Sequence, residues 1–250
     1  MRALAAVTAT ELRLFSREPM TVLFALVLPV VILYVLNGVF GSQPVDPSVW
    51  EGIGAVDFYT SAYVALVAAT VGILTVPVHL AGYREQGVLR RFRASALSPA
   101  ALLGAHVVVA TCVATVGAVL VAGVSILAYG ALLPQDWVGV IAAHLLCAVS
   151  FAMLGALLGL VLPTARAAQG LGVLLFFVFM MLGGAGPPSE VLPDTLVRVG
   201  DGLPVTYAAR LLRGPWLGDG MDLGAAGVIT GLLVASTLLT AWRLRTDDRL

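Results

Sequence analysis

The sequence predicts an all-α integral membrane protein, with six transmembrane helices in a single domain that spans residues 1–250. Composition gives the first reason: 60% of the residues are hydrophobic and 11% are charged, whereas a soluble domain has about 25% charged residues. The second reason is the recurrence of apolar runs of about 20 residues, the length that crosses a bilayer as a helix. Together these runs leave no room for a separate soluble domain.

The N-terminal residues 1–19 are expected to form an amphipathic interfacial helix that carries Arg13, Arg17 and Glu18. Its apolar residues recur at helical spacing, which is typical of a helix lying at the membrane surface. Because this charged helix continues into a long apolar span, a cleaved secretory signal is not expected. The six spans are expected over residues 20–40, 57–80, 100–133, 137–162, 167–183 and 221–242.

An external segment at 184–220 is expected between the last two spans. Prolines and charged residues interrupt its apolar stretches, and two short helical patterns occur, at 191–199 and after Pro204. Neither pattern is long enough to cross a bilayer. We therefore expect short re-entrant or surface helices, covered by protein or water wherever their backbone is unpaired.

Residues 82–99 concentrate charge between the second and third spans and are expected to form a short cytoplasmic amphipathic helix. At about 100° per residue, Val88, Leu89 and Phe92 share one side. Arginines next to a span can bind acidic lipid headgroups. The alternative is docking into another protein, which Glu85 favours because it lies about 60° from Val88 among the apolar residues.

Arginine placement predicts the topology. Six spans put both termini on one side, and assigning that side to the cytoplasm places eleven of the fourteen basic residues inside. This agrees with the excess of basic residues in cytoplasmic loops. The opposite face then carries most of the acidic residues.

The residue types present argue against an enzyme. All basic residues are arginine, and a P-loop requires a lysine on the nucleotide phosphates. Of the three histidines only His144 lies within a span, where an interhelical hydrogen bond is the expected role. Cys112 and Cys147 fall inside apolar runs and are expected as free, buried side chains. No metal site and no catalytic residue is predicted.

Two patterns within the spans leave alternatives open. Gly155 to Gly159 and Gly227 to Gly231 are GxxxG patterns, which permit close helix approach either inside the chain or against a second subunit. A bulky apolar run in the fifth span could line a path for an apolar substrate, or could equally be core or lipid-facing surface. Its residues are Phe176, Phe177, Phe179 and Met180.

The stretch from Tyr83 to Pro99 resembles the R-E-x-G-T-L-x-R-L-R-x-(S/T)-P-L-S signature of type-2 ABC exporter permeases, the class that includes daunorubicin-resistance membrane subunits. It departs from that signature with Val88 for threonine and Ala96 for proline. The resemblance extends to Arg17-Glu18-Pro19 before the first span and to proline-containing segments at 188–193 and 203–207.

This resemblance implies a permease subunit in a bacterial inner membrane, with both termini cytoplasmic and a role such as drug resistance. It would pair with a second copy or a similar subunit, contact membrane lipids but no nucleic acid, and bind a separate ATP-binding cassette subunit that holds ATP and magnesium. The substrate would be moved outward, and the scarcity of charge within the spans favours a lipophilic compound or lipid over a polysaccharide. The contact with the ATPase, through a coupling helix at 82–99, would involve Arg84, Glu85, Gly87, Leu89, Arg90, Arg91, Phe92 and Arg93. The external helices would form an outer gate that includes Pro188, Pro193, Pro204 and Tyr207.

Two other classes of protein remain open from the sequence. One is a six-span half of a secondary transporter, and the other is a membrane immunity or assembly factor without a transport cycle. Neither alternative explains the charged segment at 82–99 with its Glu85.

Overall fold

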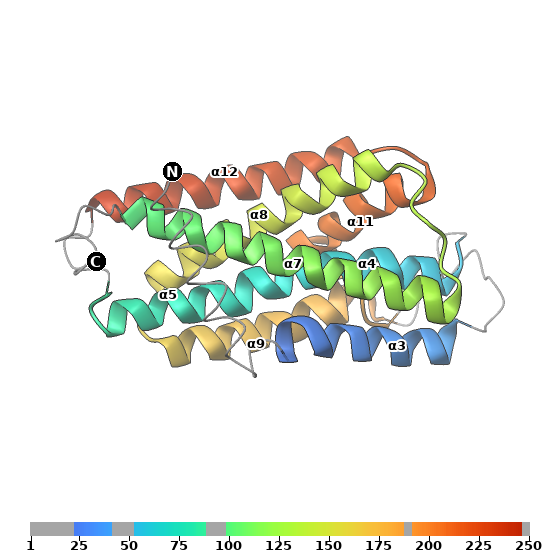
Figure 1. Cartoon of the computed structure of the whole chain (residues 1–250), viewed down its shortest axis with the longest axis horizontal. Helices are drawn as coiled ribbons and strands as arrows, with labels where there is room; N and C mark the ends of the chain where they lie inside the picture. The colour runs from blue at the N-terminus through green and yellow to red at the C-terminus, as the bar shows by residue number, and fades with distance from the viewer. Residues whose placement is uncertain (1–22, 42–52, 89–98, 188–191, 247–250) are drawn as a thin grey trace.

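The computed structural model describes residues 23–41, 53–88, 99–187 and 192–246. These residues form a bundle of helices, most of which run along one long axis (Figure 1). The elements are η1 (Leu23–Val27), α3 (Leu28–Phe40), α4 (Ala55–Thr70), η2 (Val71–Thr75), α5 (Val76–Glu85), α7 (Pro99–Tyr129), α8 (Trp137–Val161), α9 (Ala165–Leu182), α10 (Asp194–Asp201), α11 (Pro204–Leu217) and α12 (Leu223–Thr246).

Five helical stretches are long and apolar enough to cross a membrane, at 55–85, 100–129, 137–161, 165–182 and 223–246. They coincide with five of the six predicted spans, so the helical membrane class is confirmed. The predicted first span, 20–40, begins outside the described residues. Its described part consists of the five-residue π-helix η1 and the 13-residue α3, so the count of six spans stays a prediction.

The second span is longer than predicted, because α4, η2 and α5 form one continuous helix from Ala55 to Glu85. A π-helical turn, η2, joins its two halves just before Pro77, which has no N–H to donate to the helix. The helix ends only at Glu85 and is followed by its C-cap Gln86 and by Gly87, which has a φ of 66°. This left-handed conformation favours glycine and stops helices. The first residues of the predicted 82–99 helix therefore belong to the second span.

Helix α8 crosses this long helix at very short range through glycines. A Cβ on Gly155 would lie 1.9 Å from the carbonyl oxygen of Gly72, and one on Gly159 would lie 2.8 Å from Cβ of Leu80. The first GxxxG pattern therefore serves packing inside the chain, the first of the two alternatives that the sequence left open. Gly227 and Gly231 in α12 are exposed, and a Cβ added to either would meet no atom within 4 Å, so the second pattern does not contribute to this packing.

The two cysteines differ in burial. Both have free thiols, as predicted, and Cys147 in α8 is fully buried. The prediction of burial is wrong for Cys112, which is exposed on α7. An apolar run shows only that a helix suits a membrane, because each side of such a helix can face either lipid or protein.

Two short helices follow α9, near the positions of the predicted short helices. Helix α11 is buried within the bundle, where it packs against α4, α8 and α12. It starts at Pro204, a favourable first residue of a helix, and ends before Gly218, which has a φ of 90°. Leu211 and Leu212 are fully buried. The depth of α10 and α11 in a membrane stays a prediction.

The connection from α7 to α8 is fastened to α4 and α11. The backbone N–H of Leu132 donates to Oδ1 of Asp57 at 2.8 Å, and Nε1 of Trp216 donates to the carbonyl oxygen of Leu132 at 2.9 Å. Asp136 then caps α8 by accepting a hydrogen bond from the N–H of Gly139 at 3.0 Å. These bonds fix the end of the bundle at which α11 lies.

Candidate functional site

The two ends of the bundle differ in charge. One end, called here the Arg84 end, holds the last turns of α5, α8 and α12 and the first turns of α7 and α9 (Figure 1). Its described charged residues are Arg84, Glu85, Arg166, Arg243 and Arg245. The other, the α11 end, carries more acidic than basic groups among its described residues, namely Asp57, Asp136, Asp194, Arg198, Asp201, Arg210, Arg213, Asp219 and Asp222.

Arg84 joins the end of α5 to the end of α8. Its Nη1 donates to the carbonyl oxygen of Gly159 at 3.1 Å and to that of Leu162 at 2.8 Å. The residue four positions after Gly159 is Pro163, which has no N–H, so the Gly159 carbonyl lacks the usual intrahelical donor. A cation is also favourable at the negative end of the helix dipole. Arg84 therefore caps α8.

The neighbouring Glu85 is exposed and so is Gln86. Of the eight predicted ATPase contacts, the structure describes Arg84, Glu85 and Gly87. The side chain of Arg84 binds carbonyl oxygens at the end of α8, whereas Glu85 is exposed at the surface of the Arg84 end. The other five, Leu89, Arg90, Arg91, Phe92 and Arg93, lie outside the described residues, as do Arg13, Arg17 and Glu18 of the predicted interfacial helix.

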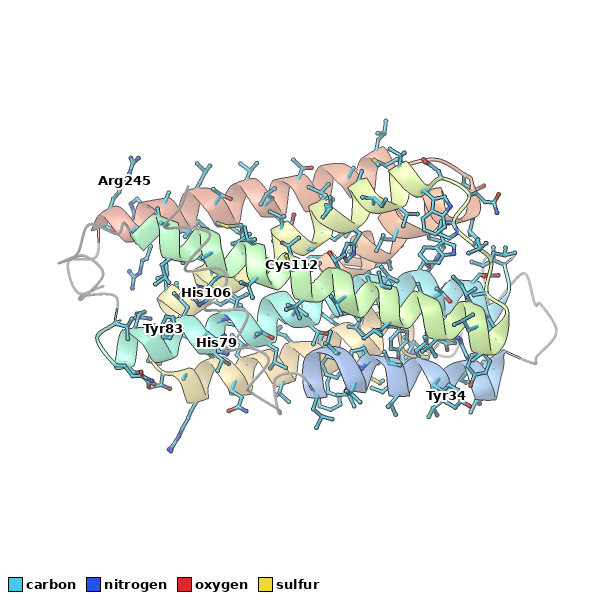
Figure 2. All side chains as sticks on the ribbon, viewed as in Figure 1. Tyr34, His79, Tyr83, His106, Cys112 and Arg245 are labelled. Atoms are coloured by element: carbon cyan, nitrogen blue, oxygen red, sulfur yellow. The ribbon has the colours of Figure 1, made fainter. Side chains whose placement is uncertain are left out.

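An aromatic cluster fastens the beginning of α7 to α5. The ring of His106 lies 5.5 Å from that of Tyr83 and 6.5 Å from that of His79, centroid to centroid (Figure 2). Nδ1 of His106 also lies 3.0 Å from the carbonyl oxygen of Leu102. The cavity beside the two histidines is only about 10 Å³, space for about one water. Within the described chain no group of three potential metal ligands occurs.

The predicted substrate-path residues do not share one surface. Phe176, Phe179 and Met180 are buried, whereas Phe177 is 51% exposed. Phe179 packs edge-on against Phe151 of α8, with ring centroids 6.2 Å apart. None of the four lines either cavity described next.

An apolar groove of about 390 Å³ runs between α7, α8 and α11. Its walls include Val64, Ile126 and Trp137, and among the described residues that line it His144 is the one ionisable side chain. Nε2 of His144 lies 3.2 Å from Oγ1 of Thr115, so the predicted interhelical hydrogen bond is confirmed. This polar pair joins α7 to α8.

A second cavity, called here the α11 pocket, has about 300 Å³ and lies between α4, α9, α10 and α11. Arg213 lines it and is only 9% exposed. The guanidinium carbon of Arg213 lies 4.0 Å from the ring centroid of Phe58, and its Nε donates to Oγ of Ser61 at 3.4 Å. Arg210 also lines the pocket and pairs with Asp201 at 3.1 Å.

Hydrogen bonds between elements hold the walls of this pocket. Oγ1 of Thr206 donates to the carbonyl oxygen of Gly200 at 2.6 Å, which fastens α11 to α10. The hydroxyl of Tyr59 donates to the carbonyl oxygen of Gly186 at 3.0 Å, which fastens the segment after α9 to α4. These bonds fix the positions of the elements that form the pocket.

None of the three predicted outer-gate residues that the structure describes lines this pocket, although they lie on or beside the helices that form it. Pro193 immediately precedes α10 and Pro204 begins α11. Tyr207 lies in α11, with its ring centroid 5.8 Å from the guanidinium carbon of Arg210. Pro188 lies outside the described residues. Sequence reasoning missed Arg213, whose signal was an arginine on the apolar face of a helix, between Leu212 and Trp216.

The fold and the distribution of charge define a multi-pass helical membrane protein, and its described residues include no cluster typical of a metal enzyme. The chain belongs to the ABC-2 type transporter family, whose sequence model matches residues 2–216. It is also 26% identical over 226 residues to a protein described as "Putative transport permease YvfS" of Bacillus subtilis (strain 168), which covers 86% of this chain and 87% of that protein. The chain is therefore a transmembrane permease subunit.

Proposed function

We propose that this permease subunit exports a lipophilic compound or lipid, using ATP that a separate ATP-binding cassette subunit hydrolyses. Membership of the ABC-2 family supports a transport role. The observation that carries the coupling is the bond from Arg84 to the end of α8, beside the exposed Glu85. ATP and magnesium belong to the partner, since this chain has no lysine for a P-loop.

Movement of the ATPase would be coupled to the bundle because α5 and α8 are joined at the Arg84 end. An ATPase that binds Glu85 and the segment after Gly87 would displace the end of α5. Because Arg84 holds α8 to α5 and glycines hold the two helices in close contact, both would move together. ATP binding then favours one of two arrangements of the bundle through its differential affinity for them.

This mechanism places the Arg84 end in the cytoplasm, where ATP is available. The basic residues described at that end and the acidic residues at the α11 end support this orientation. The protein would lie in a bacterial inner membrane with both termini inside. A second copy, or a similar permease subunit, would complete the path across the membrane.

Co-purification of the ATPase with tagged permease tests the proposal. With Glu85→Ala, membrane abundance should stay near normal, while ATPase recovery falls, because removal of a charged interface partner costs about 2–5 kcal/mol. Gln86→Ala is the matched control, exposed and adjacent but uncharged. The double variant Arg90→Ala, Arg91→Ala separates docking from lipid anchoring, since anchoring would depend more on these two arginines.

The outcomes distinguish the proposal from its alternatives. Unchanged ATPase recovery with Glu85→Ala would remove Glu85 from the interface. Export that continues when the partner's P-loop lysine is replaced would favour a secondary transporter. The permease purified alone should hydrolyse no ATP. Hydrolysis by the pure chain would contradict the assignment of ATP hydrolysis to a separate subunit.

A further inference from the structure

The apolar groove between α7, α8 and α11 contains a polar pair. Among the described residues that line it, Thr115 and His144 are the two polar side chains apart from the tryptophans. His144 is only 6% exposed, whereas Thr115 is exposed on α7. The lining falls at positions 64, 115–126, 134–145 and 216, all well inside the described ranges. Polar groups are costly inside a membrane bundle, and they commonly mark a binding site or a path.

The hydroxyl of Thr115 has one hydrogen-bonding position open. A hydroxyl has one proton and two lone pairs. Oγ1 of Thr115 donates its proton to the carbonyl oxygen of Thr111 at 2.8 Å, and Nε2 of His144 lies 3.2 Å from the same Oγ1. Because the hydroxyl proton is already used, Nε2 is the donor in the second bond. One lone pair of Oγ1 is then left, on a side chain that lines the groove and is exposed.

Nδ1 of His144 lacks the same kind of partner. When the proton of a neutral imidazole is on Nε2, Nδ1 is an acceptor. Among the described residues, this atom is buried and has no hydrogen-bond partner. A buried acceptor without a donor is unfavourable, because it has lost its bond to water and gained none. The polar end of the groove therefore has two acceptor positions open and lacks a donor.

From this arrangement we infer that the apolar groove binds a neutral lipophilic compound with a hydroxyl group. The hydroxyl donates to Oγ1 of Thr115, and the apolar part lies along Ile126 and Trp137. A phosphate or carboxylate anion only accepts hydrogen bonds, so this end of the groove disfavours it. The volume of about 390 Å³ is within the range of ligand pockets. The inference rests on the proposed function in treating the occupant as a transported compound, and it narrows the substrate to neutral hydroxylated lipophiles.

The position of the groove suits an exit path. It extends along α8 from His144 to Trp137, which are seven positions or about 10 Å of helix apart. Trp137 begins α8 at the α11 end, opposite Arg84 (Figure 1). In the proposed orientation this end is external. Ile141 and Leu145 line the groove and are exposed on the side of the bundle, so a compound can enter it laterally from the lipid.

Quenching of tryptophan fluorescence tests the inference on the full-length permease, reconstituted in phosphatidylcholine nanodiscs. The probe is 10-bromodecan-1-ol, whose bromine quenches nearby indoles, and Trp137 and Trp216 line the groove. Saturable quenching is expected. The methyl ether of the same bromoalkyl chain cannot donate a hydrogen bond and should bind about fivefold less tightly. The permanent anion 10-bromodecyl sulfate should also bind less tightly than the alcohol.

Two substitutions separate the hydroxyl contact from the apolar fit. Thr115→Val removes the hydroxyl at nearly constant volume and should abolish the preference for the alcohol over the ether, whereas Thr115→Ser should keep it. Because this preference is a ratio measured within one folded protein, a lower yield does not alter it. Ala122→Phe should fill the groove and remove saturable quenching by both probes. Leu120→Phe is the control, since Leu120 is exposed on α7 and does not line this groove.

Several results would overturn the inference. Equal binding of the alcohol and the ether to the parent protein would indicate ordinary lipid contact. A preference that persists in Thr115→Val, or saturable quenching that persists in Ala122→Phe, would place the probe outside this groove. Tighter binding of the sulfate would contradict a neutral ligand. If Thr115→Val fails to fold, the ratio in the parent protein and the loss in Ala122→Phe still decide. The assay contains no ATPase, so a failure of the coupling at Glu85 would not change its result.

Discussion

The guanidinium of Arg84, in the last turn of α5, donates a 2.8 Å hydrogen bond to the carbonyl oxygen of Leu162, the residue that ends α8. Arg84, a residue of the motif expected to contact the ATPase, thus binds another helix of the same chain. The adjacent Glu85 is exposed at the surface. Arg84 and Glu85 should therefore respond differently to substitution.

Arg84→Ala should lower stability by about 1–2 kcal/mol, because two charge-assisted hydrogen bonds to α8 are lost at a partly buried position. The midpoint of thermal unfolding in detergent measures this loss. Arg166→Ala, exposed at the same end of the bundle, is the control and should change little. An Arg84→Ala protein as stable as the parent would show that the cap contributes nothing.

Gly155→Leu should disrupt the crossing of α8 over the long second span. A Cβ there would lie 1.9 Å from the carbonyl oxygen of Gly72, so the helices must separate. Overpacking of this kind costs about 1–3 kcal/mol or more. Gly231→Leu in α12 is the matched control, because a Cβ added there meets no atom within 4 Å. Membrane abundance and unfolding temperature should fall for the first variant only.

Single cysteines should report the orientation of the bundle. Cys112 is exposed, so Cys112→Ala provides the background, while the buried Cys147 can stay. Gln135→Cys and Asp219→Cys, at the α11 end, should react with an impermeant thiol reagent added to intact cells. Gln86→Cys and Arg245→Cys should react only after lysis; reaction of Gln86→Cys in intact cells would reverse the assignment.

Ser125→Ala should loosen a polar contact between α3, α4 and α7. Nδ2 of Asn37 donates to Oγ of Ser125 at 3.1 Å, and Thr60 bonds to the same hydroxyl. Interhelical hydrogen bonds in membranes contribute about 0.6 kcal/mol on average and at most about 2. The variant should lose stability in that range, measured by thermal unfolding. Thr237→Ala, on the exposed face of α12, should lose less.

Apolar length and local capping could be predicted well from the sequence. Five predicted spans appear as helices, because an apolar run of about 20 residues crosses a bilayer with all its backbone groups paired only as a helix. The turn at Asp136 and the start of α11 at Pro204 follow from capping and from the fixed φ of proline. Each of these features depends on residues that are neighbours in the chain.

The signature around Arg84 and Glu85 could also be recognised as a motif, but its geometry could not. A helical projection places residues relative to their own helix axis and contains no information on which other helix lies beside them. The cap on α8 depends on Pro163, which is 79 positions after Arg84 in the chain and leaves the Gly159 carbonyl without a backbone donor. The projection of 82–99 as one separate helix could not include that contact.

The sequence by itself determined the class of the protein. Hydropathy and arginine placement reflect how each segment interacts with lipid and water, and this does not depend on which other segment it packs against. Tertiary structure decided which glycine pattern packs, why Phe177 faces outward while Phe176 is buried, and that Arg213 lines an interior pocket. These depend on contacts between segments far apart in the chain, such as Arg213 with Ser61, and so arise only when the helices have packed.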